Sequence, residues 1–150
     1  MSDPPSSQSK RGNPAFQLNH VSRLMTRYFD RRLALLGVNV AYLAVLRALQ
    51  ESGRLSQKEL IEIGRIGQPA MAQMLERMVK DDLLVRAQDA GDKRKAIFAL
   101  SDTALELIPQ IKAVLNEGNA EVFAALDETE LTEFLDTMQK LEDRLTSLGK

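Results

Sequence analysis

Two short segments of the chain carry side chains suited to contacts with a nucleic acid. The first contains two glutamines and an arginine, Gln68, Gln73 and Arg77. A glutamine amide donates and accepts at once and can pair with the edge of an adenine, whereas a guanidinium binds phosphate. The second segment, residues 92–95, is an aspartate followed by three cations. Both kinds of contact fit the grooves and the backbone of double-stranded DNA.

Gln73 and Arg77 of the first segment fit one face of an amphipathic helix, which we predict over residues 68–82. Pro69 suits the first turn, because the backbone N–H that proline lacks has no helical partner there. The apolar side chains repeat with helical spacing and form one stripe, made of Met71, Met74, Leu75 and Met78. At about 100° per residue, the opposite face carries Pro69, Ala70, Gln73, Arg77 and Lys80.

Three helices are expected before this one. The apolar spacing of residues 15–36 predicts a helix that ends at Gly37, and Asn39 can cap the helix that follows. Residues 56–59, Ser-Gln-Lys-Glu, form a capping box, in which the serine and glutamate side chains accept from each other's backbone N–H. The helix that this box starts is short, because Gly64 follows within two turns.

The pattern after residue 82 indicates strands. Residues 84–87 and 96–100 are short apolar runs, separated by the polar segment 88–95, which ends in three cations. This predicts a β-hairpin. A helix, a short capped helix, an amphipathic helix and a basic hairpin in this order predict a winged helix-turn-helix in a mainly α chain. Such a unit places one helix in the major groove of DNA and its hairpin at the minor groove.

Two long helices are predicted in the last third of the chain. Ser101 can cap the first, in which we expect Pro109 to cause a bend or local strain. The second starts at Asp127, and its apolar side chains follow steps of three and four: Leu131, Phe134, Met138, Leu141, Leu145 and Leu148. This narrow seam is typical of a coiled coil and requires a partner helix. We favour a helix of a second copy over the chain's own first helix.

The composition excludes several kinds of site. Among 150 residues there are no cysteines and one histidine, which excludes disulfides, thiol switches and clustered histidine or thiolate metal sites. We find no nucleophile with a histidine partner and no phosphate-binding glycine loop, so we expect no enzyme, no cofactor and no metal. No segment has the roughly 18 apolar residues of a membrane span. Residues 1–14 are expected to form a disordered tail without a signal peptide, in a cytoplasmic protein.

The charge is unevenly distributed, although the net charge is only −1. Residues 1–53 carry 7 basic and 3 acidic side chains, residues 54–100 carry 9 and 7, and residues 101–150 carry 4 and 11. A basic region beside an acidic one accompanies nucleic-acid binding in many proteins, and it also fits a solvated acidic helix surface. Charge by itself leaves both interpretations open.

Taken in order, these segments resemble the MarR family of bacterial transcriptional regulators, over about residues 16–148. Residues 55–60, Leu-Ser-Gln-Lys-Glu-Leu, are similar to the start of the helix that precedes the family's recognition helix. Residues 68–78 are similar to the recognition helix itself. The loop 89–95, with Asp92 and Arg94, looks like the family's wing.

The resemblance implies a homodimer that binds a palindromic operator, represses transcription and is released by a small aromatic or anionic effector. Residues 38–100 are then the DNA-binding domain, and residues 15–37 and 101–150 are the dimerisation helices. The expected DNA contacts are Ser56, Gln57, Gln68, Pro69, Ala70, Gln73, Arg77, Asp92, Lys93, Arg94 and Lys95. The expected effector contacts are His20, Arg23, Tyr42 and Arg47. The expected dimer contacts are Val21 and the six residues of the last seam.

The sequence departs from the family pattern in three places. Ala70 and Ala72 stand where the family carries small hydroxylated residues, so hydroxyl contacts to phosphate are lost, and Gln73 favours adenine. Gly64 stands in place of a leucine and predicts a loose helix end. Asp81-Asp82 replaces a turn of a basic residue and glycine and brings acidic groups near the DNA-binding face. A winged-helix module that binds only other proteins is therefore the alternative function.

Overall fold

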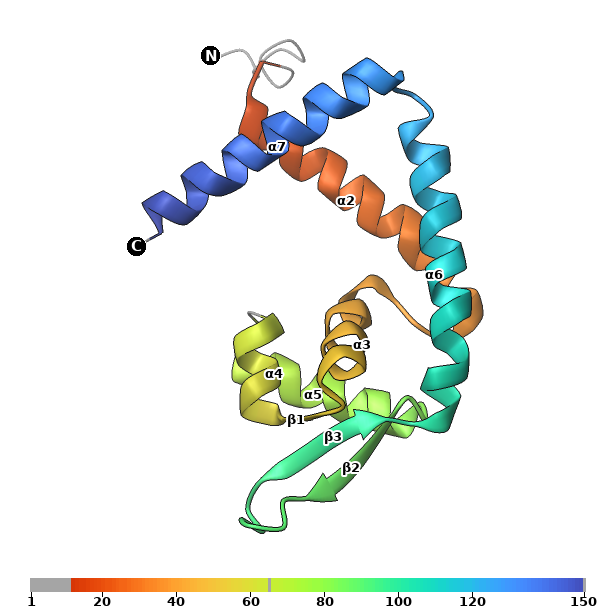
Figure 1. Ribbon diagram of the computed structural model, residues 1–150, viewed down its shortest axis with the longest axis vertical. Helices are drawn as coiled ribbons and strands as arrows, with labels where there is room; N and C mark the ends of the chain where they lie inside the picture. The colour runs from red at the N-terminus through yellow and green to blue at the C-terminus, as the bar shows by residue number, and fades with distance from the viewer. Residues whose placement is uncertain (1–11, 65, 150) are drawn as a thin grey trace, which may run out of the picture. The chain divides into compact units, whose positions relative to one another are not determined.

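The computed structural model describes residues 12–64 and 66–149. Residues 1–11 of the expected tail lie outside this range, and Pro14 already opens the first described helix. Figure 1 shows the elements. In chain order they are α2 (Pro14–Leu33), η1 (Ala34–Leu36, a 3-10 helix), α3 (Val40–Ser52), β1 (Arg54–Ser56), α4 (Gln57–Gly64), α5 (Gln68–Lys80), β2 (Leu84–Gln88), β3 (Ala96–Leu100), α6 (Asp102–Phe123) and α7 (Glu128–Leu148).

The described residues are mainly helical and contain one small sheet, so the predicted fold class is confirmed. The chain divides after Val114 into two compact units. The first unit holds every element from α2 to β3 and the first half of α6, whereas the second holds the rest of α6 and all of α7. The predicted DNA-binding segments all belong to the first unit.

Side-chain caps and one glycine set the helices at the beginning of the chain. At the start of α2, Asn13 Oδ1 accepts from the backbone N–H of Phe16 at 3.1 Å. Gly37 then has a φ of 74°, a left-handed conformation that costs glycine little and ends η1 as predicted. Asn39 Oδ1 accepts from the backbone N–H of Tyr42 at 3.1 Å, so the predicted cap of α3 is confirmed.

The predicted capping box starts α4. The backbone N–H of Glu59 donates to Ser56 Oγ at 3.2 Å, and the backbone N–H of Ser56 donates to Glu59 Oε2 at 2.7 Å. The bond from the Ser56 backbone is the main cause that lowers the pKa of the Glu59 carboxyl. A lowered pKa means that the cap stabilises the helix most when Glu59 is ionised.

Gly64, where the sequence predicts a loose helix end, is the last residue of α4 and lies against Met71 of α5. A Cβ atom added to Gly64 would lie 2.9 Å from Cε of Met71, whose side chain is fully buried. The absence of a side chain on α4 therefore lets the methionine of α5 fill the space between the two helices. The leucine expected at this position is replaced in the packing by Met71.

The predicted hairpin forms, and a third strand joins it. In the antiparallel pair of β2 and β3, Leu84 lies opposite Leu100 and Gln88 lies opposite Ala96. β1 pairs with the other edge of β3, which gives the strand order β1-β3-β2. β1 was not predicted from the sequence, because three residues before a helix cap are too few to show the alternation of a strand.

The core of the first unit lies between the helices and one face of this sheet. Three of the four apolar residues predicted to form the stripe of α5, Met71, Leu75 and Met78, are buried, and Met74 is half-buried. They share the core with residues from α3, α4 and the sheet, among them Val45, Leu49, Leu60, Leu84 and Phe98. The orientation of α5 is thus fixed by burial of its apolar stripe.

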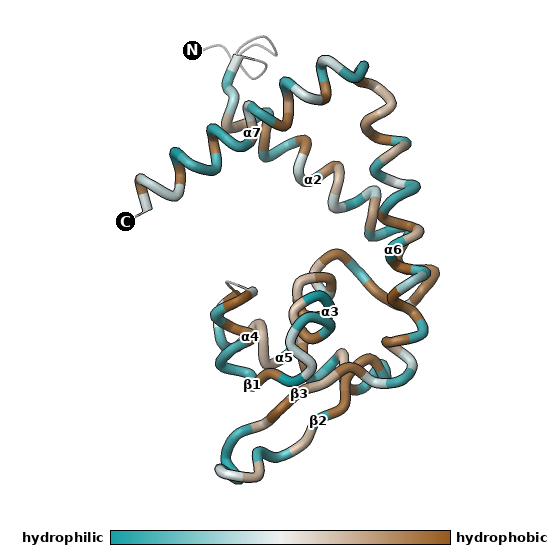
Figure 2. The backbone as a smooth tube through the Cα atoms, viewed as in Figure 1, coloured by the Kyte–Doolittle hydropathy of each residue, from teal (hydrophilic) through white to brown (hydrophobic). Residues whose placement is uncertain are grey.

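The two last helices begin at predicted caps. Ser101 Oγ accepts from the backbone N–H of Ala104 at 3.0 Å at the start of α6, and Asp127 Oδ1 accepts from that of Glu130 at 2.8 Å at the start of α7. Pro109 lies inside α6 without ending it. None of the described residues of α7 is buried, and Figure 2 shows hydrophobic and hydrophilic positions alternating along it.

Within the described part of the chain, no helix by itself has the length and apolar character of a membrane span. Residues Pro14–Leu36 and Val40–Ser52 meet these two criteria only when taken together, and they are bent by 66° at their junction. Five residues of the second stretch are buried in the core of the first unit.

Candidate nucleic-acid interface

One face of α5 is exposed from the first turn of the helix to the last. Because its apolar stripe is buried, the side chains predicted for the opposite face are exposed, and so is Gln68 at the first position of the helix; in chain order the exposed residues are Gln68, Pro69, Ala70, Gln73, Arg77 and Lys80. The first four lie in the first two turns of the helix, which are the turns that contact base edges when a recognition helix enters a major groove. Arg77 and Lys80 supply positive charge in the last turn.

The start of α4 offers fewer free groups than α5. The Ser56 side chain is buried, and its hydroxyl oxygen already accepts from Glu59, so its role as a cap is confirmed. Gln57 follows directly and is half-buried. A contact of this helix with phosphate therefore depends on the Gln57 amide and on the O–H of Ser56, which can still donate a hydrogen bond.

The loop between β2 and β3 is held in shape by aspartates. Asp89 Oδ1 accepts from the backbone N–H of Gly91 at 3.0 Å, and Asp92 Oδ1 accepts from that of Arg94 at 3.0 Å. The backbone N–H of Lys95 also donates to the carbonyl oxygen of Asp92 at 3.0 Å. Asp92 therefore orders the loop, while the side chains of Lys93, Arg94 and Lys95 remain exposed.

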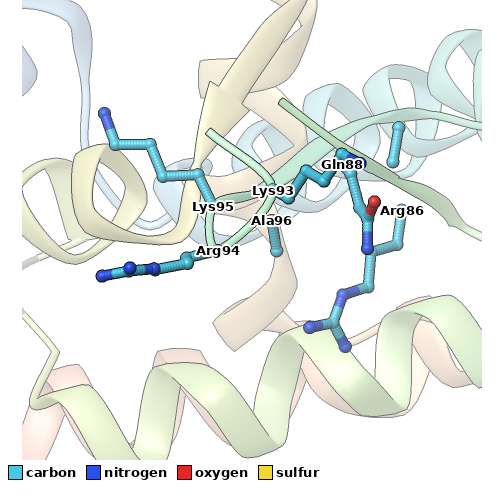
Figure 3. A pocket seen from close by; sticks show the side chains of 7 residues that line it. Arg86, Gln88, Lys93, Arg94, Lys95 and Ala96 are labelled. Carbon is cyan, nitrogen blue, oxygen red and sulfur yellow. The ribbon is translucent and has the colours of Figure 1, made fainter. Parts of the chain in front are cut away.

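A shallow cavity of about 310 Å³ lies against this loop (Figure 3). Arg86, Lys93, Arg94 and Lys95 line it, together with Gln88 and two alanines. Figure 3 shows Arg94 and Lys95 extending from one side of the loop and Arg86 from the other. No acidic side chain lines the cavity, so this part of the wing can accommodate a group with negative charge.

Arg86 was not among the DNA-contacting residues predicted from the sequence. This residue lies in β2 opposite Phe98, and its guanidinium carbon is 6.0 Å from the centre of the Phe98 ring. The strand alternation places Arg86 on the same face as the buried Phe98, beyond the edge of the core. That alternation was the signal available in the sequence, because a cation on the core side of a strand must have a specific reason to be there.

Arg77 and Asp81 both influence a buried tyrosine. Tyr42, on α3, is 3% exposed, and its hydroxyl donates to Asp81 Oδ2 at 3.4 Å. Burial is the largest cause that raises the pKa of Tyr42, the charge of Asp81 adds to it, and Arg77 opposes it. No salt bridge joins Arg77 to Asp81 among the described residues, so the guanidinium, although it interacts with Tyr42, is not paired with that carboxylate.

The four residues expected to bind an effector lie in different environments. Tyr42 is buried and donates to Asp81, whereas Arg47 is exposed and pairs with Glu51 at 3.1 Å. His20 and Arg23 are exposed on α2, and the His20 ring stacks on Phe16 with 6.4 Å between the ring centres. The cavity described above is not lined by any of these four residues.

The residues expected at a dimer interface are largely uncovered within one chain. Val21 is 42% exposed on α2, and Leu145 and Leu148 are more than 60% exposed on α7. Leu131 and Met138 are half-buried, and Phe134 packs its ring 5.9 Å from that of Phe123. Exposed apolar side chains along a helix mark a surface that a partner helix can cover.

The small sheet, the two helices α4 and α5, and the basic loop after them define a winged helix-turn-helix protein. Residues 36–95 match the family model of the MarR family. This match confirms the resemblance found in the sequence: residues 36–95 form a winged helix of the MarR type.

Solved structures of MarR-type proteins share the fold at low sequence identity. A MarR-like transcription regulator from Bacillus cereus matches with a TM-score of 0.79 and 20% identity, over 86% of this chain and 93% of that one. A cysteine-to-serine mutant of MarR from E. coli, in complex with operator DNA, matches with a TM-score of 0.77 and 20% identity, over 91% and 99%. A MarR transcriptional regulator from Methanosarcina mazei matches with a TM-score of 0.75 and 17% identity, over 88% of this chain and 95% of that one.

Proposed function

We propose that the chain is a DNA-binding transcriptional repressor that acts as a homodimer on a palindromic operator. The observation that carries this proposal is the exposed face of α5 beside a wing whose cavity is lined by four cations and no anions. Two surfaces of these kinds in one compact unit match the two grooves that a winged helix contacts. The operator-bound MarR of E. coli, which has the same fold, supports the same mode of binding.

Each group on this interface has a role that its chemistry favours. Gln68 and Gln73 contact base edges from the first turns of α5, and Gln73 selects adenine. Ala70 and Pro69 bring the helix close to the groove, where a methyl group can contact thymine. Arg77 and the half-buried Gln57 position the protein on phosphates. The wing cations Lys93, Arg94 and Lys95 contact the minor groove and the adjacent backbone, in a loop ordered by Asp92.

The homodimer is proposed from the uncovered helices. An isologous dimer repeats the DNA-binding unit about a two-fold axis, and two recognition helices one turn of DNA apart then require a palindromic site. The seam of α7 is amphipathic and unburied in one chain, which supports a second copy as its partner. Val21 and the neighbouring apolar residues of α2 are proposed to take part in the same interface.

Regulation by a small aromatic or anionic molecule is proposed from the family resemblance. His20, Arg23, Tyr42 and Arg47 remain the proposed contacts, and two copies of the chain would have to complete the pocket. We place the protein in the cytoplasm, where bacterial DNA is found, and propose no catalytic activity.

The test is selection of bound sequences from a random pool of double-stranded DNA, followed by fluorescence anisotropy with the selected sites. We expect a palindrome with half-sites about 10 base pairs apart, and affinity that falls steeply with salt. The variant Gln73→Ala should relax the preference at one base pair in each half-site, at a cost of about 1–3 kcal/mol per contact. Gln110→Ala, which removes an exposed glutamine from α6, is the matched control and should leave the preference unchanged.

Three outcomes would contradict the proposal in different ways. Selection of a single, non-repeated motif would contradict the dimer on a palindrome. An unaltered base preference in Gln73→Ala would contradict the orientation of α5 in the groove. Absence of salt-dependent binding at physiological ionic strength would contradict DNA binding altogether and would favour the alternative, a winged-helix module that binds other proteins.

A further inference from the structure

The turn after α5 contains a residue in an unusual backbone conformation. Asp82 has a φ of 59°, and it is the one residue other than glycine with a positive φ among residues 12–64 and 66–149. This left-handed conformation costs most residues free energy, although Asp and Asn tolerate it better than others. Glycine would adopt it without strain. An aspartate at this position therefore carries a conformational cost that contacts of its side chain can offset.

That side chain and its backbone connect the turn to the first residues of α6. The hydroxyl of Thr103 donates to Asp82 Oδ2 at 2.8 Å, and the hydroxyl of Ser101 donates to the carbonyl oxygen of Asp82 at 2.6 Å. The backbone N–H of Ser101 also donates to the carbonyl oxygen of Leu83 at 3.0 Å. Three hydrogen bonds thus connect the end of the recognition helix to the start of α6. We call these groups the α5–α6 joint.

The joint is continuous with both helices. The backbone N–H of Asp82 donates to the carbonyl oxygen of Val79 in the last turn of α5 at 3.1 Å. On the other side, Ser101 is the cap of α6, and Thr103 lies in the first turn. α6 continues past Val114 into the second compact unit, which also contains the seam of α7. A change of direction at the joint is therefore a change in the direction of α5 relative to α6.

From these contacts we infer that Asp82 is a positioning residue, which fixes the angle between α5 and α6 and thereby the half-site spacing that the dimer accepts. The inference rests on the proposed function, since only a dimer on two half-sites has a preferred spacing. Adjacent base pairs of DNA are rotated by about one tenth of a turn, so recognition helices held at a fixed angle fit one spacing. With a loose joint, each DNA-binding unit of the dimer would reorient, and the dimer would accept several half-site spacings.

The experiment compares the affinity of variants for the selected palindrome, for palindromes with the half-sites one or two base pairs closer or farther apart, and for a single half-site. Thr103→Val removes the hydroxyl at an exposed position of α6 and keeps the shape of the side chain. Asp82→Gly removes the carboxylate and keeps the positive φ. Asp82→Asn keeps both an acceptor oxygen and tolerance of this φ, so it serves as the matched control for the loss of charge. Thr103→Ser restores the hydroxyl.

We expect the wild-type chain, Asp82→Asn and Thr103→Ser to prefer one spacing by about tenfold, the value of two such hydrogen bonds per dimer. Thr103→Val and Asp82→Gly should lose most of this preference, with unchanged affinity for the single half-site. If Asp82→Gly fails to fold, Thr103→Val alone tests the inference.

A spacing preference that Thr103→Val keeps would overturn the inference while the proposed function stands. The inference would also be overturned if Thr103→Val weakened binding to the single half-site as much as binding to every palindrome. The joint would then only stabilise the fold of the DNA-binding unit. A wild-type chain that binds no DNA would overturn the proposed function itself, before any variant is compared.

Discussion

Replacement of Arg94 by alanine tests whether the wing contacts DNA through its charge. Arg94 is exposed, its backbone is fixed by Asp92, and its side chain lines the basic cavity of the wing. A homodimer carries two copies, and each phosphate neutralised contributes about 0.9 to the slope of log affinity against log salt. The variant should therefore reduce the magnitude of this slope by about 1.8. Between 50 and 200 mM salt, the difference in affinity between wild type and variant should then shrink by about tenfold.

The assay is a series of anisotropy titrations with the selected operator at four or more salt concentrations. Lys112→Ala is the control, because Lys112 is an exposed cation on α6 and its loss changes the net charge by the same amount. We expect the control to keep the wild-type slope. An unchanged slope in Arg94→Ala would refute a wing contact through this residue. An equal reduction in both variants would show that net charge, not the wing, controls the salt dependence.

Three further predictions concern stability and assembly. Burial and the charge of Asp81 raise the pKa of Tyr42 above its ordinary value of 10.0, so its contribution to stability is complete below pH 10 and is lost as the pH rises through the folded value. Urea unfolding between pH 8 and 11 should show a smaller alkaline loss in Tyr42→Phe. Hydrogen bonds from Ser56 lower the pKa of Glu59, so the stability that Glu59 contributes is present above its ordinary pKa and is lost as the pH falls through the lowered value. Melting temperatures between pH 3 and 7 should show less acid dependence in Glu59→Gln, and equal pH profiles would contradict this account of the cap. Leu141→Glu places a charge in the seam of each of two chains. Because burying a leucine contributes about 1.5–3 kcal/mol, the dissociation constant of the dimer, measured by sedimentation, should rise at least about a hundredfold. An unchanged dissociation constant would exclude this seam from the interface.

Local signals in the sequence were sufficient for most helix and strand limits. The capping box at Ser56, the cap at Asn39 and the left-handed Gly37 all form as predicted, because each depends on contacts within a few residues. The amphipathic spacing of α5 likewise determined which of its faces is buried. The exposed face of the candidate interface followed directly from that spacing.

The sequence was less informative wherever distant residues meet. β1 depends on pairing with β3, more than forty residues later, and its three residues carry no pattern of their own. Met71 fills the space that the missing side chain of Gly64 leaves, a contact between two helices that the sequence did not predict. Arg86 joins the wing cations only because the hairpin register places it at the same cavity.

Asp82 shows most clearly what the sequence determines and what only the tertiary structure determines. The sequence indicates only that an aspartate stands where the family has a glycine, and it suggests acidic charge near the DNA-binding face. The tertiary structure places the carboxylate against Thr103 and gives the residue a positive φ, so that it connects two helices. Helix limits and buried faces were determined by the sequence because they arise from neighbours along the chain. The joint, the third strand and the wing cavity were decided by the tertiary structure, because they arise from residues brought together only when the whole unit folds.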